Sequence, residues 1–559
     1  MKFSELKYER PDFKKYQEEL NNIAKKIVNA ANADEIFEAY DEYCNIEAEY
    51  GEVMAIAFIR AYQDSTDEFY NGEMGYNLSE DAKLDRNVVF KALLDCPFRK
   101  EIDEKYGSQL LRIIEKNASL TKEAAEERCK LAELENKYQT LKATIKFEYN
   151  GEILSEGEIR KLRQSEDREV RKEATYIFYK TFADKRDEFM SILREMVRLR
   201  NKISKANGYD TYLEYMDVEK GRYTYGEKEL TNLCELVKEK LVPIAKKLYE
   251  NIKNDLGLDS YKLCDYGIYS KEGELTTSGN AKEILGQGRD MYRDLSDDMY
   301  KLYDSMIEEE FFDCESSTNK IAGIGFATNL LKSKKAFVFA NFNGTVDSDI
   351  AVVTHEFGHA YQMSNTMKKV DVYDYINMPN DLAEIPSKTM EQLSHDYAEV
   401  FFKGRGEQYI KEHKIALLEE ILGYCRTHEF ETFLYTNEDA TEEEIIKRYM
   451  ELDEIYSGGL DTLDEKEFLE QGAFLYKNMG LYMFPRYLIS YVLSDITAIM
   501  IKKIYDDNKE EGLRLYKDLC ELGGTLEYSD AMKYLGLQLA YTEEAVEVAR
   551  ESFMELLNE

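Results

Sequence analysis

Proline is scarce in this sequence, with six residues among 559. Proline interrupts helices and central strands, and apolar residues here recur every three or four positions, so the sequence predicts a mainly α protein. An Asn-Gly pair within 145–154 interrupts the helical pattern and indicates a small hairpin. We expect an N-terminal helical lobe over 1–205 and a second lobe over 206–559. Long helical stretches are expected at 14–70, 100–143 and 156–205.

The sequence has fewer basic than acidic residues. Lysine and arginine total 74 against 111 aspartates and glutamates, which gives a net charge of −37. A charge of this sign repels phosphates, so it argues against nucleic acid and against anionic membrane surfaces as partners. The most apolar late stretch, 481–501, contains Arg486 and Asp495 and falls short of a membrane-spanning helix. The sequence leaves the oligomeric state open.

Paired cysteines and an export signal are also missing. The eight cysteines are scattered without a C-x-x-C pair, which is typical of reduced, mostly buried thiols. The first eight residues include charged side chains where a signal peptide needs an apolar core. Both features predict a cytoplasmic protein.

Histidine is rare as well, and two of the five histidines stand four residues apart. His355, Glu356 and His359 form the pattern H-E-x-x-H, which places two imidazoles on one face of a helix, where they can hold a metal ion. The carboxylate of Glu356 is offset to the edge of that ion and can take a proton from attacking water. Ser348 or Asp349 is expected to cap the helix. Two buried histidines on an ordinary helix are the alternative, which the rarity of the pattern disfavours.

A catalytic zinc needs three protein ligands, so a third must be found downstream. One metalloprotease class uses a histidine ten residues after the first, but Asn365 stands there and the next histidine is His395. Glu384 is a candidate, because Pro386 is tolerated only in the first turn of a helix and so places Glu384 near a helix start. Glu391 lies two turns later on the same face and can orient a ligand histidine. From spacing alone, Glu384 could equally well be a solvated surface carboxylate as a metal ligand. For Glu391 the solvated carboxylate is the better explanation.

The clearest predicted strand, 336–343, precedes the H-E-x-x-H helix. Alternating residues give it two distinct faces, and an exposed strand edge beside a metal site can hold an extended peptide through main-chain hydrogen bonds. A structural strand that packs the helix is an equally good interpretation. The candidate substrate-binding residues are Phe339, Asn341, Asn343 and Gly344.

The H-E-F-G-H segment, with E-I-P-S beginning at Glu384, resembles the M3 family of zinc metallopeptidases, the thimet oligopeptidase and oligoendopeptidase F group. The nearest likeness is to the bacterial oligoendopeptidases of the Pz-peptidase type. This resemblance implies Glu384 as third ligand, one zinc ion per chain and short peptides as substrates. It also implies two helical lobes around a deep channel, with a small β-sheet next to the zinc helix. Further matching segments are 8–11, 337–345, 485–491 and 522–525.

Tyr487 and Tyr491 lie in one of these segments, one helical turn apart. With 43 tyrosines in the chain the spacing alone means little, and only the resemblance implies that their hydroxyls donate to the oxyanion of the transition state. Many relatives have a histidine about five residues before the proline of this segment, whereas 478–482 contains none. Either the tyrosines act without it, or Tyr482 or a group from elsewhere replaces it.

The resulting hypothesis is a zinc-dependent oligoendopeptidase whose second lobe is catalytic and whose general base is Glu356. A carboxypeptidase or dipeptidyl carboxypeptidase on a similar helical scaffold is one alternative. An isopeptidase or other amidase is another. A catalytically silent peptide-binding protein is the third, and it has no need of the intact base.

Overall fold

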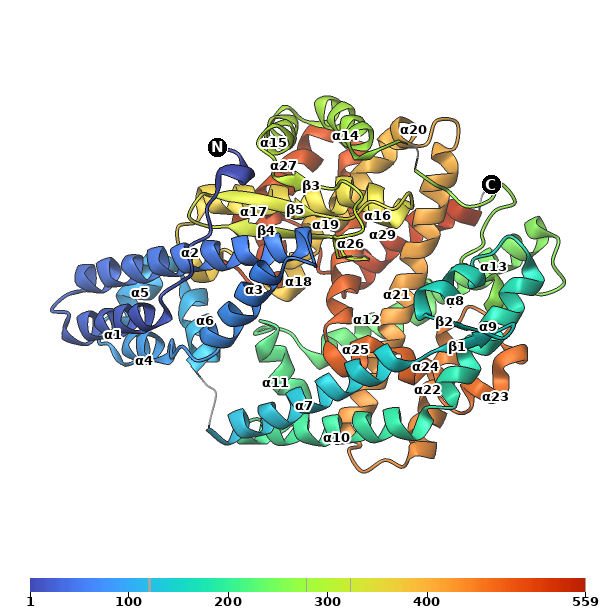
Figure 1. The fold of residues 1–559 in the computed structure, drawn as a ribbon, viewed down its shortest axis with the longest axis horizontal. Helices are drawn as coiled ribbons and strands as arrows, with labels where there is room; N and C mark the ends of the chain where they lie inside the picture. The colour runs from blue at the N-terminus through green and yellow to red at the C-terminus, as the bar shows by residue number, and fades with distance from the viewer. Residues whose placement is uncertain (119–121, 278, 322, 558–559) are drawn as a thin grey trace. The chain divides into compact units, whose positions relative to one another are not determined.

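The computed structural model describes residues 1–118, 122–277, 279–321 and 323–557. Helices dominate it, which confirms the mainly α class (Figure 1). In these ranges we find no helix that combines the length and apolar character needed to cross a membrane. The chain forms two compact units. Unit 1 comprises Met1–Ser119, Leu275–Ile410 and Thr497–Leu537, and unit 2 comprises Leu120–Glu274, Lys411–Ile496 and Gln538–Glu559.

This partition differs from the division expected at residue 205. Residues 122–205 pack within unit 2, where α7 (Lys122–Thr144) lies along α10 (Arg186–Ala206). The H-E-x-x-H segment belongs to unit 1 together with the N-terminal helices. Helices that follow one another in the chain need not pack together, so sequence continuity did not reveal the units.

Unit 1 begins with helices whose N-termini are capped by polar side chains. The Asp12 side chain accepts a hydrogen bond from the Lys15 N–H, and Asn32 caps the next helix in the same way. The helices of this unit are α1 (Phe13–Asn29), α2 (Ala33–Gln63), α3 (Glu68–Asp81), α4 (Asn87–Asp95), α5 (Arg99–Tyr106), α6 (Ser108–Ala118), α14 (Ala281–Leu295), α15 (Asp297–Glu308), α16 (Val346–Ala351), α17 (Phe357–Lys369), α18 (Asn380–Ala383), α19 (Ile385–Ser394), α20 (Ala398–Phe401), α27 (Lys509–Leu522) and α28 (Tyr528–Leu535).

Unit 2 contains the hairpin that the Asn-Gly pair predicts. Asn150 and Gly151 adopt left-handed φ values of 51° and 82° and join β1 (Phe147–Tyr149) to β2 (Glu152–Leu154). The long helices α21 (Gly406–Thr436) and α26 (Leu488–Asp507) each contain a boundary between the units. The remaining helices of unit 2 are α8 (Glu156–Arg163), α9 (Arg168–Ala183), α11 (Tyr212–Glu219), α12 (Glu227–Lys240), α13 (Val242–Leu256), α22 (Glu442–Tyr456), α23 (Lys466–Leu469), α24 (Ala473–Lys477), α25 (Met479–Met483) and α29 (Glu543–Met554).

A three-stranded sheet in unit 1 supports the candidate site. Its order is β3 (Phe312–Asp313), β5 (Lys335–Phe339) and β4 (Phe326–Leu330), with β5 parallel to β3 and antiparallel to β4. Helix α17 packs against both β4 and β5, and the three lie side by side in yellow in Figure 1. The expected small sheet next to the H-E-x-x-H helix is therefore present.

Of the two interpretations of 336–343, an exposed edge and a structural strand, the burial of β5 favours the structural strand. β5 pairs with β4 over its whole length and with β3 at Val338 and Phe339, and Phe337, Val338 and Phe339 are fully buried. In the described part of the chain β3 and β4 each pair only with β5, so β4 forms one edge of the sheet and the two-residue β3 forms the other. The alternating pattern identified a strand, but the neighbours of that strand come from segments that the pattern does not reveal.

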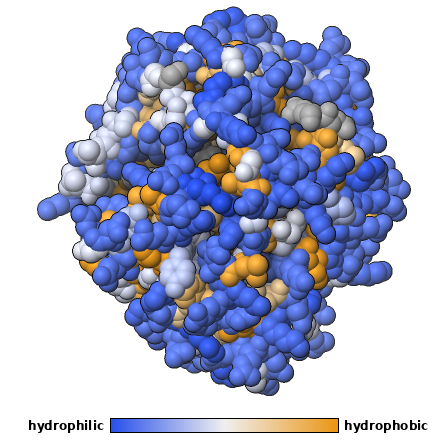
Figure 2. Space-filling view, turned by 90° about the vertical axis from the view of Figure 1, so that its right-hand side faces the viewer, coloured by the Kyte–Doolittle hydropathy of each residue, from blue (hydrophilic) through white to orange (hydrophobic). Residues whose placement is uncertain are grey.

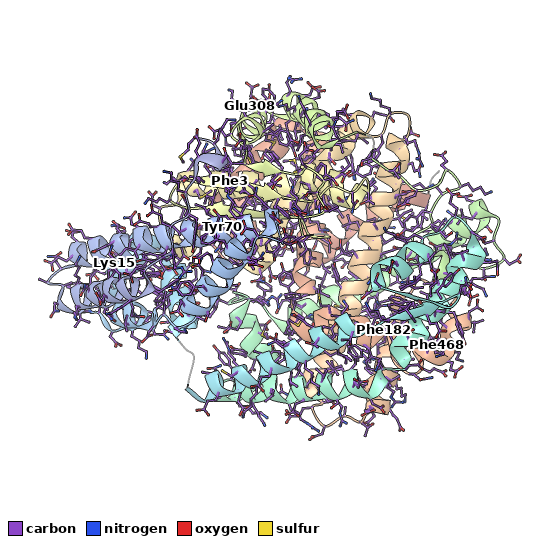
Figure 3. All side chains as sticks on the ribbon, in the orientation of Figure 1. Phe3, Lys15, Tyr70, Phe182, Glu308 and Phe468 are labelled. Carbon is purple, nitrogen blue, oxygen red and sulfur yellow. The ribbon has the colours of Figure 1, made fainter. Side chains whose placement is uncertain are left out.

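The outer surface and the interior differ in polarity. On the face drawn in Figure 2 hydrophilic residues predominate and hydrophobic residues occur in scattered groups. Inside unit 1, the N-terminal Phe3, labelled in Figure 3, packs its ring 4.4 Å from the ring of Phe337. The Phe3 N–H donates to Glu309 O at 2.9 Å, so the start of the chain is fixed to the sheet region.

Candidate metal centre

The H-E-x-x-H segment begins in a widened helical turn. Helix α16 is followed by a π-helical turn, Val352–Glu356, and α17 continues from it. His355 and Glu356 lie in the π turn, and His359 lies in the first turn of α17. The three side chains thus come from one continuous helical segment, as their spacing predicts.

Thr345 caps this segment, and its hydroxyl accepts a hydrogen bond from the Ser348 N–H at 3.3 Å. The expectation that Ser348 or Asp349 is the cap is wrong, because the helix begins before either residue. Asp349 is buried, and its carboxylate accepts the N–H groups of Asn343 and Gly344 at 3.1 and 3.2 Å. Asp349 therefore fixes the loop that enters the helix.

Three ligand-type atoms converge in unit 1. The Nε2 atoms of His355 and His359 are 3.2 Å apart, and Oε2 of Glu384 lies 3.4 and 3.2 Å from them. Among the described residues this is the one group of at least three His, Cys, Asp or Glu side chains arranged to hold a metal ion. Two imidazoles and a carboxylate form a donor set that suits a catalytic zinc ion.

Glu384 lies where the sequence predicts, at the start of α19 with Pro386 in the first turn. The Ser387 hydroxyl donates to Glu384 Oε2 at 2.9 Å, which restrains the carboxylate. Gly358 lets the two helices approach, because a Cβ added there would lie 2.7 Å from the Ser387 Cα and 2.9 Å from the Pro386 carbonyl oxygen. The glycine in H-E-F-G-H is thus required for the ligands to meet.

Glu391 orients the first histidine. Its Oε1 lies 2.5 Å from His355 Nδ1, and its side chain is 13% exposed. Burial opposes a charged imidazole, but the hydrogen bond and negative charge of Glu391, with Glu356 and Glu384 nearby, raise the pKa of His355 to about 9. Burial likewise opposes the charge of Glu384, yet His359 and His355 hold the pKa of Glu384 well below its usual range. Glu391 thus engages Nδ1 and leaves Nε2 directed at the cluster.

Glu356 lies beside the start of the edge strand. A Cβ added to Gly325, the residue before β4, would lie 3.8 Å from Glu356 Oε1. A chain that added to β4 would therefore run close to this carboxylate. The sequence does not predict β4; the only nearby signal is the pair of glycines before it, of which Gly323 has a left-handed φ of 73°.

The candidate substrate-binding asparagines are engaged in the loop that leads to the helix. The Asn341 amide bonds to the Ser317 carbonyl at 2.9 Å, and Asn343 Oδ1 accepts the Thr345 N–H at 3.1 Å. Phe339 is fully buried. A role of these residues and of Gly344 in substrate binding stays a prediction.

Tyr487 and Tyr491 belong to unit 2, at the start of α26. Their rings are 5.4 Å apart and nearly perpendicular, and Tyr424 lies 5.6 Å from Tyr491. Tyr482 is fully buried, stacks on another tyrosine ring and donates its hydroxyl to Phe189 O at 3.3 Å. Tyr482 therefore has a packing role within unit 2, and the catalytic role of the other two stays a prediction.

Arg486, directly before Tyr487, has a left-handed φ of 60° and a fully buried side chain. Its N–H donates to Glu431 Oε1 at 2.9 Å, and its guanidinium donates to Thr432 Oγ1 at 2.9 Å and to Glu227. Burial raises the pKa of Glu431 to about 7, against the opposing charge of Arg486. The sequence shows Arg486 only as an interruption of an apolar stretch, and its partners are distant along the chain.

Comparison with known proteins agrees with this geometry. Residues 161–286 and 292–550 match the model of peptidase family M3, and residues 3–121 match that of the peptidase M3 N-terminal domain. The chain belongs to peptidase family M3. It is 23% identical to the oligopeptidase PepF of Bacillus subtilis (strain 168), over 98% of this chain and 84% of that protein.

Solved structures extend the likeness to the whole fold. Pz peptidase A, solved with an inhibitor, is 28% identical, with a TM-score of 0.89 and coverage of 100% of this chain and 99% of that one. The oligoendopeptidase F of Enterococcus faecium is 17% identical, with a TM-score of 0.64 and 98% of each chain covered, and shows the fold alone. The family and these relatives together indicate a metallopeptidase that hydrolyses peptides.

Proposed function

We propose that this M3 peptidase is a zinc-dependent oligoendopeptidase that cleaves internal bonds of short unfolded peptides with Glu356 as general base. The observation that supports it is the convergence of His355, His359 and Glu384, with Glu356 on the same helical segment and a strand edge beside it. Seven of the eight cysteines are buried and all are free, in keeping with the expected cytoplasmic location.

Zinc suits this centre because two imidazole nitrogens and one carboxylate oxygen leave a fourth position open. When bound there, zinc would polarise the scissile carbonyl and lower the pKa of water toward about 7. His355, His359 and Glu384 would hold the ion, and Glu391 would keep His355 in the tautomer that presents Nε2.

The residues of the chain then perform the proton transfers. Glu356 accepts a proton from the attacking water and delivers it to the leaving amine, which lets one carboxylate serve both halves of the reaction. The hydroxyls of Tyr487 and Tyr491 are proposed to donate hydrogen bonds to the oxyanion, because a tyrosine donates without ionising.

The substrate main chain is proposed to pair with the edge of β4. An extended peptide added to an edge strand is held by backbone hydrogen bonds, which accept many side chains. Because β4 begins beside Glu356, the scissile bond of a paired peptide would lie near the base. Edge pairing requires an unfolded substrate.

The assignment of the metal ligands can be tested by substitution. We expect loss of both zinc and activity in each of three variants, His355→Ala, His359→Ala and Glu384→Ala. The variant Glu384→Gln keeps the shape of the side chain at 384 and removes only its charge. Zinc stoichiometry measured beside turnover checks this assignment. Retention of full zinc affinity in Glu384→Ala, with loss in Glu391→Ala or in Asp381→Ala, which alters the buried carboxylate three residues before Glu384, would show that the third ligand has been misplaced.

Product mapping by mass spectrometry on a mixed peptide library distinguishes internal from terminal cleavage. Internal fragments are expected from peptides with either a free or an amidated C-terminus. A requirement for the free carboxylate would overturn the endopeptidase assignment in favour of a carboxypeptidase. Zinc binding without any cleavage would favour a peptide-binding protein.

A further inference from the structure

The turn that carries the general base has hydrogen bonds unlike those of an α-helix. The Phe357 N–H donates to Val352 O, five residues back, and to Thr354 O. In an α-helix the same N–H would donate to Val353 O, four residues back. The Val353 carbonyl has therefore lost the donor that a regular helix would supply, which is a cost unless another donor replaces it.

Tyr292 supplies that donor. Its hydroxyl, which comes from α14, donates to Val353 O at 2.8 Å in a fully buried contact. Burial also raises the pKa of Tyr292 well above its usual value, so the hydroxyl keeps its proton. In the same segment the Thr354 hydroxyl donates to Ile350 O at 2.9 Å. Side-chain hydroxyls thus serve two carbonyls around the widened turn.

Close packing fixes the position of this hydroxyl. Gly288 lies one turn before Tyr292 on α14, and a Cβ added there would be 2.7 Å from Val353 Cγ1. The Tyr292 ring lies 4.4 Å from the ring of Phe357, the residue that follows the π turn. Helix α14 therefore rests directly on the turn, with no room for a side chain at 288.

We propose that Tyr292 is a positioning residue for the metal centre, holding the π turn so that His355 and Glu356 face the cluster. This inference rests on the proposed zinc function. The segment is anchored on both sides of the turn, by the Thr345 cap before it and by the packing of Gly358 after it. Relaxation of the turn to α-helical bonding would rotate the residues after it relative to those before it, and the ligands would no longer meet.

Tyr303 offers a matched control. It lies beside Tyr292 with rings 4.7 Å apart, it is fully buried, and its ring lies 4.9 Å from Phe357. Among the residues that the structure describes, no hydrogen-bond partner is found for its hydroxyl. Tyr292→Phe and Tyr303→Phe therefore each remove one buried hydroxyl from the same aromatic group, but only the first removes a donor to the turn.

The experiment compares both variants with the wild type in three measurements. Zinc affinity is expected to fall about 10- to 100-fold in Tyr292→Phe, as for other outer partners of metal ligands, and to stay unchanged in Tyr303→Phe. The visible absorption bands of the cobalt(II)-loaded protein should change only in Tyr292→Phe, because they report ligand geometry. In the metal-free protein, hydrogen exchange of peptides covering 352–358 should accelerate only in that variant.

The outcomes are distinguishable. Equal zinc affinity, equal cobalt spectra and equal exchange in Tyr292→Phe and Tyr303→Phe would overturn the role of Tyr292. A wild-type protein that binds zinc but cleaves no peptide would overturn the proposed function alone. If the wild type bound no zinc, the exchange measurement would still decide whether Tyr292 holds the turn.

Discussion

The metal cluster and the tyrosine segment are held in place by different means. In unit 1 the ligands come from two helices that touch at Gly358, so the arrangement depends on close packing of backbone. In unit 2 the chain before Tyr487 is fixed by Arg486, a fully buried residue with a left-handed backbone and hydrogen bonds to Glu431 and Glu227.

The difference shows which changes would disturb each region. A centre built by close packing is sensitive to one added methyl group, because backbone atoms cannot move aside cheaply. A segment fixed by buried charges is sensitive to protonation and to loss of a partner. The metal cluster is complete within unit 1, whereas the tyrosines act on substrate only if the proposed function is right.

Glu356→Gln should give the largest effect. Because it removes the base and no metal ligand, turnover should fall by about 10²–10⁴-fold while zinc content stays near that of the wild type. Turnover and zinc stoichiometry should be measured on one preparation. A variant that kept more than about a tenth of the wild-type rate would contradict the assignment.

Tyr487→Phe and Tyr491→Phe test whether unit 2 takes part in catalysis. If either hydroxyl donates mainly to the transition-state oxyanion, kcat should fall about 10²–10³-fold for at least one variant, with KM little changed. If both hydroxyls only satisfy buried partners, stability should fall by about 1 kcal/mol and kcat should stay within a few-fold. An unchanged kcat in both variants would remove these residues from the mechanism and leave the metal centre unaffected.

Gly358→Ala tests the packing of the metal centre. The added Cβ would lie 2.7 Å from the Ser387 Cα, so the two ligand helices must separate. We expect the free energy of unfolding to fall by about 1–3 kcal/mol and zinc affinity to fall with it. Zinc titration and urea unfolding measure both quantities.

Gly286→Ala is the matched control in the same unit. Gly286 lies within α14, and no atom outside its own helix lies within 4 Å of an added Cβ. This variant should gain about 0.5–1 kcal/mol of stability and keep its zinc affinity. Equal losses in both glycine variants would refute the close-packing explanation.

Glu431→Gln tests the buried charges of unit 2, and its effect is expected only in the dependence of stability on pH. Burial raises the pKa of Glu431 to about 7 in the folded protein, above the unfolded value of about 4.3. A raised carboxyl pKa gives stability that is complete below the unfolded value and is lost as the pH rises through the folded value. The free energy of unfolding of the wild type should therefore fall by up to about 1 kcal/mol per pH unit between about pH 4.3 and 7. In Glu431→Gln this part of the pH dependence should be absent. Unfolding curves of wild type and variant across this range provide the check, and identical slopes would exclude the role of Glu431.

Much of the metal centre could be predicted because its residues lie on two helices close together in the chain. The four-residue spacing of His355 and His359 and the place of Pro386 predicted which side chains share a face. The same helical period placed Glu391 on the face of Glu384, but by spacing alone a solvated carboxylate explained it better, and only the structure places it against His355. Spacing alone did not decide between a ligand and a solvated carboxylate at Glu384; the structure brings it to the histidines.

The sheet and the units could not be predicted in this way. The strand at β5 was recognised from its alternation, but its pairing with β3 and β4 depends on segments that alternation does not identify. The helix cap was misplaced, because several polar residues around Thr345 could each have served. The division at residue 205 assumed that neighbours in the chain pack together.

By itself the sequence determined the helical class, the hairpin at Asn150 and Gly151, and the set of metal-ligand candidates, because each depends on local period or turn chemistry. Tertiary structure alone decided which strands are the edges of the sheet, which three stretches make each unit, and that Tyr292 donates to Val353. The physical reason is the range of the interactions. Helical faces and turns are fixed by residues a few positions apart, whereas strand edges and buried hydrogen bonds depend on partners that only the folded chain brings together.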